Sequence, residues 1–189
     1  MNDWNLINQL KQGDQAAFKQ IVETWQDMVY NTAMGIVQNA EDAEDVAQEV
    51  FVQVYQSVEG FKGNSKFSTW LYRITLSKAM DHERRKKRKK RFAIIRSLFG
   101  PAGEPVTDPP DFNHPGILFD RKEKAAILFR AMSDLPENQR IAFTLNKVEG
   151  LSYQEISEVM DTSVSAVESL LHRAKTNLRK QLKDFYESQ

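Results

Sequence analysis

The sequence predicts an all-α fold of two helical domains joined by a linker rich in proline and glycine. Apolar residues recur at three- and four-residue steps along most of the chain, as they do in amphipathic helices. No segment of useful length alternates with the period of two that a half-buried strand requires. Five of the six prolines and three of the eight glycines fall within residues 100–116. We therefore expect domains at residues 1–92 and 117–189, with a flexible linker over residues 93–116.

Four helices are expected in the first domain. Asp3, Asp14 and Asn39 are residues that cap the start of a helix well, and the helix after Asn39 should cover residues 40–57. The loop EGFKGNSK then holds two glycines and an asparagine, which favours a turn. A fourth helix should follow it and run into eight consecutive basic residues, 84–91.

The second domain should hold helices over residues 117–133, 137–148, 153–160 and 164–183. Ser152 and Glu155 have the spacing of a capping box and mark the start of the third of these helices. Asp161, Thr162 and Ser163 form a polar break before the fourth. A short helix, a three-residue turn and a longer helix with a basic end are typical of a helix-turn-helix.

Charge is strongly segregated along a chain whose formal net charge is zero. Residues 1–60 have a net charge of −8, residues 61–100 of +11 and residues 101–189 of −3. Such asymmetry predicts a surface that binds a polyanion beside an acidic surface that binds a different partner.

Several classes of protein are excluded. The chain has no cysteine, which rules out disulfides, thiolate metal sites and thiol catalysis. Its three histidines are far apart, and the P-loop, dinucleotide, zinc-protease and nucleophile-elbow motifs are missing, so we expect no enzyme, no cofactor and no metal site. No apolar run is long enough to span a bilayer, and the polar N-terminus is unlike a signal peptide. A cytoplasmic protein is expected.

The helix-turn-helix predicts DNA binding, with a plain helical hairpin as the alternative. In such a unit the second helix enters the major groove and its exposed side chains contact base edges or phosphates. The candidates are Ser165, Glu168, Ser169, His172, Arg173, Lys175, Thr176 and Arg179. Two roles are open for Glu168: it accepts a hydrogen bond from a cytosine amino group, or it closes a capping box with Ser165.

A second candidate site is the segment FKGNSKFSTWLYRI, residues 61–74, where aromatic and basic residues alternate. Aromatic rings stack on unpaired bases while cations hold the backbone, and a polar loop can surround a flipped base. The alternative is that Phe67 and Trp70 belong mostly to the core.

These motifs, in their order, resemble those of bacterial extracytoplasmic-function (ECF) sigma factors, the fourth group of the sigma-70 family. The resemblance is carried by DAEDVAQEVFVQVY, FKGNSKFSTWLYRI, LPENQR and LSYQEISEVM…SVSAVESLLHRAK. It covers nearly the whole chain, and residues 93–116 are its weakest stretch. Two sequence features depart from the family pattern: Glu168 and Leu170 stand where many relatives have basic residues, and Ser77 stands where asparagine is common.

The resemblance implies a sigma-two domain, a sigma-four domain and a function in transcription initiation. Core RNA polymerase would be bound by Asp42, Asp45, Gln48, Glu49 and Gln53. The minus-ten promoter element would be melted and held by Lys62, Gly63, Asn64, Ser65, Lys66, Phe67, Trp70, Arg73, Ser77 and Lys78. The sigma-four helix would read the minus-thirty-five element, and an anti-sigma factor is the expected regulatory partner. A stand-alone helix-turn-helix regulator that binds duplex DNA is the alternative.

Overall fold

The structure is a computed structural model, and it describes residues 3–99 and 127–187. These ranges contain helices and no strand, which confirms the predicted all-α fold. Residues 127–133 are helical. The other elements are α1 (Asp3–Lys11), α2 (Gln15–Val37), α3 (Ala40–Ser57), the 3-10 turn η1 (Val58–Gly60), α4 (Phe67–Phe99), α6 (Glu137–Lys147), α7 (Tyr153–Met160) and α8 (Val164–Glu187).

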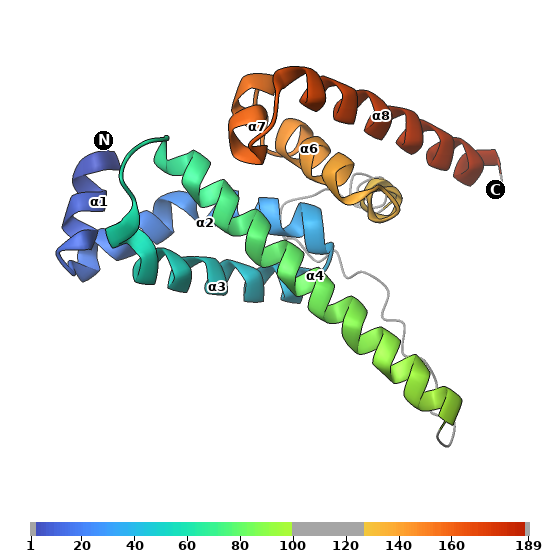
Figure 1. Cartoon of the computed structure of the whole chain (residues 1–189), viewed down its shortest axis with the longest axis horizontal. Coiled ribbons are helices and arrows are strands. Elements are labelled where there is room, and N and C mark those ends of the chain that lie inside the picture. The colour runs from blue at the N-terminus through green and yellow to red at the C-terminus, as the bar shows by residue number, and fades with distance from the viewer. Residues whose placement is uncertain (1–2, 100–126, 188–189) are drawn as a thin grey trace.

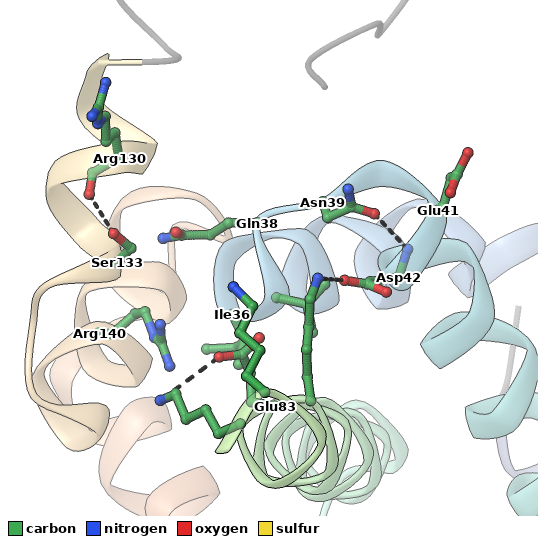
Figure 2. A pocket seen from close by; sticks show the side chains of 13 residues that line it. Ile36, Gln38, Asn39, Glu41, Asp42, Glu83, Arg130, Ser133 and Arg140 are labelled. Atoms are coloured by element: carbon green, nitrogen blue, oxygen red, sulfur yellow. Dashed lines mark hydrogen bonds and ion pairs between the residues drawn. The ribbon is translucent and has the colours of Figure 1, made fainter. Parts of the chain in front are cut away.

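Three helix starts are capped by the residues that the sequence predicts, whereas Asp3, also predicted as a cap, is itself the first residue of α1. Asp14 accepts hydrogen bonds from the backbone N–H groups of Ala16 and Ala17 at the start of α2. The side-chain oxygen of Asn39 accepts one from the N–H of Asp42 at 2.9 Å (Figure 2). Ser152 and Glu155 form the complete capping box of α7. Each cap satisfies backbone donors that the first turn leaves free, and so fixes where the helix begins.

Helix α4 continues further than predicted. The linker was expected to begin at residue 93, but the helix extends to Phe99. Its 33 residues contain neither glycine nor proline, so nothing in the local sequence stops the helix before Gly100. The rest of the predicted linker, and residues 117–126 of the predicted helix 117–133, lie outside the described residues.

The described helices form two units that share one core (Figure 1). The N-terminal unit is α1–α4, and the C-terminal unit is residues 127–133 with α6–α8. One cluster of buried apolar residues includes Ile36 and Leu71 from the first unit and Leu145 and Ile156 from the second. The two units therefore pack directly on each other, through α2 with α6 and through α4 with α7.

Candidate nucleic-acid and protein interfaces

Helices α7 and α8 form the predicted helix-turn-helix. The turn begins at Asp161, which has the left-handed φ of 50° and ends α7. Val167, Leu171, Ala174 and Leu178 bury one face of α8. On the opposite face Ser165, Glu168, Ser169, His172, Arg173, Thr176 and Arg179 are exposed, and Lys175 is half-buried. The predicted recognition residues thus share one accessible face, as groove contact requires.

The start of this helix excludes one of the two roles considered for Glu168. Ser163 accepts a hydrogen bond from the N–H of Ala166 at 3.2 Å, so Ser163 is the cap and Ser165 lies inside the helix. A capping box between Ser165 and Glu168 is therefore excluded, and the exposed Glu168 is free to contact a partner. Leu170 is partly buried and packs against the core, which explains an apolar residue at this position.

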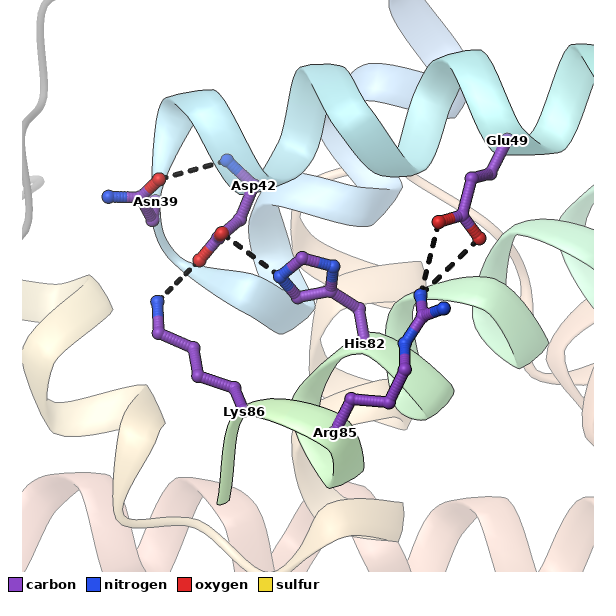
Figure 3. A network of polar contacts seen from close by, with 6 residues as sticks. All are labelled: Asn39, Asp42, Glu49, His82, Arg85 and Lys86. Carbon is purple, nitrogen blue, oxygen red and sulfur yellow. Dashed lines mark hydrogen bonds and ion pairs between the residues drawn. The ribbon is translucent and has the colours of Figure 1, made fainter. Parts of the chain in front are cut away.

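The predicted polymerase-binding face of α3 is only partly free. Asp45 and Gln48 are exposed and Gln53 is half-buried. Asp42 instead contacts His82 Nε2 at 2.9 Å and Lys86 Nζ, both on α4 (Figure 3). Glu49 accepts a hydrogen bond from Arg85 at 3.1 Å. Acidic α3 and basic α4 thus neutralise each other along this edge.

The protonation of Asp42 is set by these contacts. Burial alone would raise the pKa of its carboxyl group, but the hydrogen bond and charge of Lys86, together with His82, outweigh that effect. The net result is a pKa below its ordinary value of 3.8, because opposite charges at short range favour the ionised form.

The aromatic cluster of the predicted minus-ten site lies largely in the core. Phe61 and Phe67 are 5% and 4% exposed, whereas Trp70 is half-buried. The ring of Trp70 lies 5.1 Å from that of Phe61 and 5.6 Å from that of Phe67, centroid to centroid. The prediction that Phe67 lines the path of a DNA strand is not supported by this burial, because the first position of α4 points into the bundle. Of these three rings, only Trp70 reaches the surface.

Most polar residues of the same site are accessible. Lys62, Gly63, Asn64, Lys66, Arg73 and Ser77 are exposed, while Ser65 and Lys78 are half-buried. Gly63 has a φ of +74°, and a Cβ built on it would lie 2.6 Å from the Trp4 ring. Glycine is therefore required here both by the backbone and by the ring against which the loop packs.

Two of these exposed residues, Lys66 and Arg73, also contact the C-terminal unit. Lys66 Nζ lies 3.4 Å from Glu155 Oε1. Arg73 donates to the backbone carbonyl of Glu158 at 2.6 Å. Both partners belong to α7, so the helix-turn-helix sits against two cations of the predicted minus-ten site.

A third contact joins the same two units and was not predicted from the sequence: buried Tyr72 meets half-buried Glu149. Tyr72 donates its hydroxyl hydrogen bond to Glu149 at 2.9 Å. Burial raises the pKa of Glu149 above its ordinary value of 4.5, although the Tyr72 hydrogen bond opposes this. Burial also raises the pKa of the Tyr72 hydroxyl, and the negative charge of Glu149 raises it further. Contacts between residues 77 positions apart have no local signal in the sequence.

Comparison with known proteins decides the family. The model of Sigma-70 region 2 matches residues 21–89, and that of Sigma-70 region 4 matches residues 125–178. The chain is 34% identical over 182 residues to the ECF RNA polymerase sigma factor SigW of Bacillus subtilis, covering 94% of this chain and 95% of SigW. The chain belongs to the ECF sigma factors of the sigma-70 family.

Other sigma factors match this ECF sigma factor over similar lengths. The RNA polymerase sigma-H factor of Pseudomonas aeruginosa is 33% identical and covers 95% of this chain and 93% of its own. Two solved complexes share the fold. CnrH with the cytosolic domain of CnrY has a TM-score of 0.69 at 23% identity, over 96% of this chain and 97% of that one. The sigma factor RpoE with the anti-sigma factor NepR from Bartonella quintana has a TM-score of 0.63 at 19% identity, over 88% of this chain and 96% of that one.

These matches bear on the two functions considered from the sequence. Both sigma-70 regions are present in order, which a stand-alone helix-turn-helix regulator does not explain, so that alternative is not supported. The matched segments fall inside the two predicted domains. Within the described residues, no helix is both long and apolar enough to cross a membrane.

Proposed function

We propose that this ECF sigma factor binds core RNA polymerase and directs it to promoters, with the N-terminal unit opening the minus-ten element and the C-terminal unit reading the minus-thirty-five element. The observation that supports this most directly is the succession of region 2 and region 4 along one chain. Each region carries its own candidate DNA surface. The protein would act in the cytoplasm, where polymerase and DNA are found.

Recognition of the minus-thirty-five element is assigned to the exposed face of α8. Arg173, Lys175 and Arg179 bring cations to the phosphates, and Glu168, Ser169 and His172 face the base edges. A carboxylate at a base edge accepts a hydrogen bond from cytosine, so Glu168 would favour a cytosine within the element.

Opening of the minus-ten element is assigned to the loop of residues 62–66 and the first turns of α4. Unstacking a base costs a few kcal/mol, and stacking it on an aromatic ring returns about 1–3 kcal/mol. Trp70 supplies the accessible ring, and Phe61 and Phe67 hold that ring from below. Ser77 and Lys78 extend the same surface along α4. Stacking of the captured bases would thus offset the free-energy cost of local melting without covalent chemistry.

Polymerase binding is assigned to the acidic face of α3. Asp45, Gln48 and Gln53 are not bound to α4 and would make the first contacts. Asp42 and Glu49 are held by His82, Lys86 and Arg85. They would join only if polymerase competes with these ion pairs, which at partly exposed sites stabilise by roughly 1 kcal/mol or less.

Promoter capture competes with the packing of the two units. In this conformation α7 contacts Lys66 and Arg73, whose side chains remain exposed, so a DNA strand would have to displace these contacts. An anti-sigma factor that favours the packed arrangement would therefore oppose DNA binding at the minus-ten site. A sigma factor of the same fold, RpoE of Bartonella quintana, is bound to the anti-sigma factor NepR in a solved complex, which supports an anti-sigma factor as the expected partner.

The decisive experiment is reconstitution. Purified protein with core polymerase should start transcription from a cognate promoter found by mapping transcription starts after overexpression. Protein alone should bind the same duplex weakly. Tight and specific binding to the duplex without polymerase, with no transcription in its presence, would overturn the proposal and restore the stand-alone regulator.

A further inference from the structure

A cavity of about 540 Å³ lies where the two units meet. Its walls come from the corner between α2 and α3, from the basic part of α4, and from residues 130–140 of the C-terminal unit (Figure 2). This volume is within the range of small-molecule sites, roughly 300–1,000 Å³. The cavity is separate from the recognition face of α8 and from the loop of residues 62–66, and of the residues assigned to polymerase binding only Asp42 lines it. The proposed function therefore gives the cavity itself no role.

Two buried hydrogen-bond donors line this cavity without an acceptor. Gln38 is 9% exposed and Arg140 is 4% exposed. The amide Nε2 of Gln38 and the Nε of Arg140 are both buried and have no hydrogen-bond partner. Figure 2 shows the Gln38 amide pointing from the α2–α3 corner toward the C-terminal unit, and Arg140 approaching from α6. Leaving such donors unsatisfied is costly, and what both lack is an acceptor.

The charge of the cavity also favours an anion. Five cations and three carboxylates line it. Lys86 is paired with Asp42 and Lys87 with Glu83. The remaining cations, Lys90, Arg130 and Arg140, have no ion pair with any carboxylate in the described part of the chain. A buried guanidinium without a counter-charge is the costliest of these features.

We propose that this cavity binds a small anion that carries more than one phosphate group, with Gln38 and Arg140 as buried donors and Lys90 and Arg130 at its mouth. Arginine matches phosphate oxygens with parallel N–H donors, and several cations in one cavity suit several negative charges. Duplex DNA carries its phosphates on the outside of a wide rod, which cannot enter to reach Arg140. Because both units contribute donors, the bound anion would hold the packed arrangement together.

The test uses the full-length chain, labelled with ¹⁵N, and inorganic pyrophosphate at constant ionic strength. The side-chain resonances of Gln38 and Arg140 should shift and saturate together. ATP is the second arm: comparable or tighter binding would identify a nucleotide as the source of the phosphates, and binding of pyrophosphate alone would identify the free ion. Citrate, whose charge comes from carboxylates, should bind at least about tenfold more weakly.

Lys90→Ala and Lys89→Ala make a matched pair. Both residues are exposed on α4, but only Lys90 lines the cavity, and neither substitution threatens the fold. Loss of Lys90 should weaken pyrophosphate binding by about fivefold, while loss of Lys89 should change it by less than about twofold. Equal losses in both variants would mean diffuse attraction to the basic run and would overturn the proposal. So would an unshifted Gln38 amide at saturating pyrophosphate, or citrate binding as tightly as pyrophosphate.

Discussion

The side chain of Thr144 on α6 lies directly on Gly35 of α2. Its hydroxyl donates a hydrogen bond to the Gly35 carbonyl at 3.4 Å, and both residues are buried. A Cβ built on Gly35 would lie 2.3 Å from Thr144 Cγ2 and 2.8 Å from its Oγ1. The close approach of the two units therefore depends on the missing side chain of one residue.

Gly35→Ala should weaken the packing of the two units. The new methyl group overlaps Thr144, and overpacking of this kind costs about 1–3 kcal/mol. Thermal unfolding should show a lower Tm, and small-angle scattering a larger radius of gyration. The double variant with Thr144→Ala should recover part of the loss, since it removes both overlapping atoms. A single variant as compact and stable as the natural chain would contradict the assigned contact.

Glu149→Gln should stabilise the protein at neutral pH. Folding raises the pKa of this carboxyl above 4.5, so the folded state binds its proton more tightly and loses stability as pH rises through that range. At pH 7 the burial cost of the charge is fully present, and glutamine removes it while still accepting from Tyr72. We expect a gain of up to about 1 kcal/mol, measured by denaturant unfolding, that shrinks as pH falls toward 4.5. Glu158→Gln, which changes an exposed side chain, is the control and should show no such pH-dependent gain.

Asp42→Asn should destabilise the N-terminal unit by about 1 kcal/mol. The pKa of Asp42 is lowered by folding, so its contribution is present above its ordinary value of 3.8 and is lost as pH falls below it. Denaturant unfolding should show the variant to be less stable than the natural chain above pH 5, and the two should converge in stronger acid. Asp45→Asn, exposed on the same helix, should differ little from the natural chain at any pH. An equal effect of both variants would show that the ion pairs with His82 and Lys86 contribute nothing specific.

Glu168→Ala and Arg173→Ala should affect promoter binding differently. Loss of a base contact at Glu168 should relax the preference at one position of the minus-thirty-five element by about 1–3 kcal/mol. Arg173→Ala removes a phosphate contact and should weaken binding to all sequences. The slope of log binding constant against log salt concentration should become about one unit less steep. Binding of the reconstituted holoenzyme to a set of mutated promoters measures both. Lys147→Ala, exposed outside α8, should leave binding unchanged.

Trp70→Ala should reduce open-complex formation more than closed-complex binding. The ring is the accessible member of its aromatic cluster, so its loss removes a stacking surface worth about 1–3 kcal/mol per base. Permanganate reactivity of unpaired thymines, compared with gel-shift binding of a closed complex, separates the two steps. Trp70→Phe should retain much of the activity. Equal losses in both steps would place Trp70 in the core alone.

The fold was predictable where local chemistry decides it. Asp14, Asn39 and the Ser152–Glu155 box each fix a helix start through bonds to the next few residues, and all were read from sequence. The recognition face of α8 followed from its apolar period. The burial of Phe67 could not be predicted in this way, because an aromatic residue at a helix start fits a core or a surface equally well. The contacts of Thr144 with Gly35 and of Tyr72 with Glu149 join distant segments, and the engagement of Asp42 by α4 depends on how two helices pack.

The uninterrupted length of α4 has a consequence for how the protein meets DNA. Thirty-three residues at about 1.5 Å per residue make a rod roughly 50 Å long, and its far part projects beyond the neighbouring helices (Figure 1). Successive residues on a helix are turned by about 100°, so the eight basic residues at 84–91 encircle the rod as a collar. The first four of these residues, 84–87, are paired with carboxylates. The last four, 88–91, are exposed; they attract phosphates from several directions and so speed encounter, but they impose no single orientation. Orientation is left to the loop before Phe67 and to the exposed face of α8.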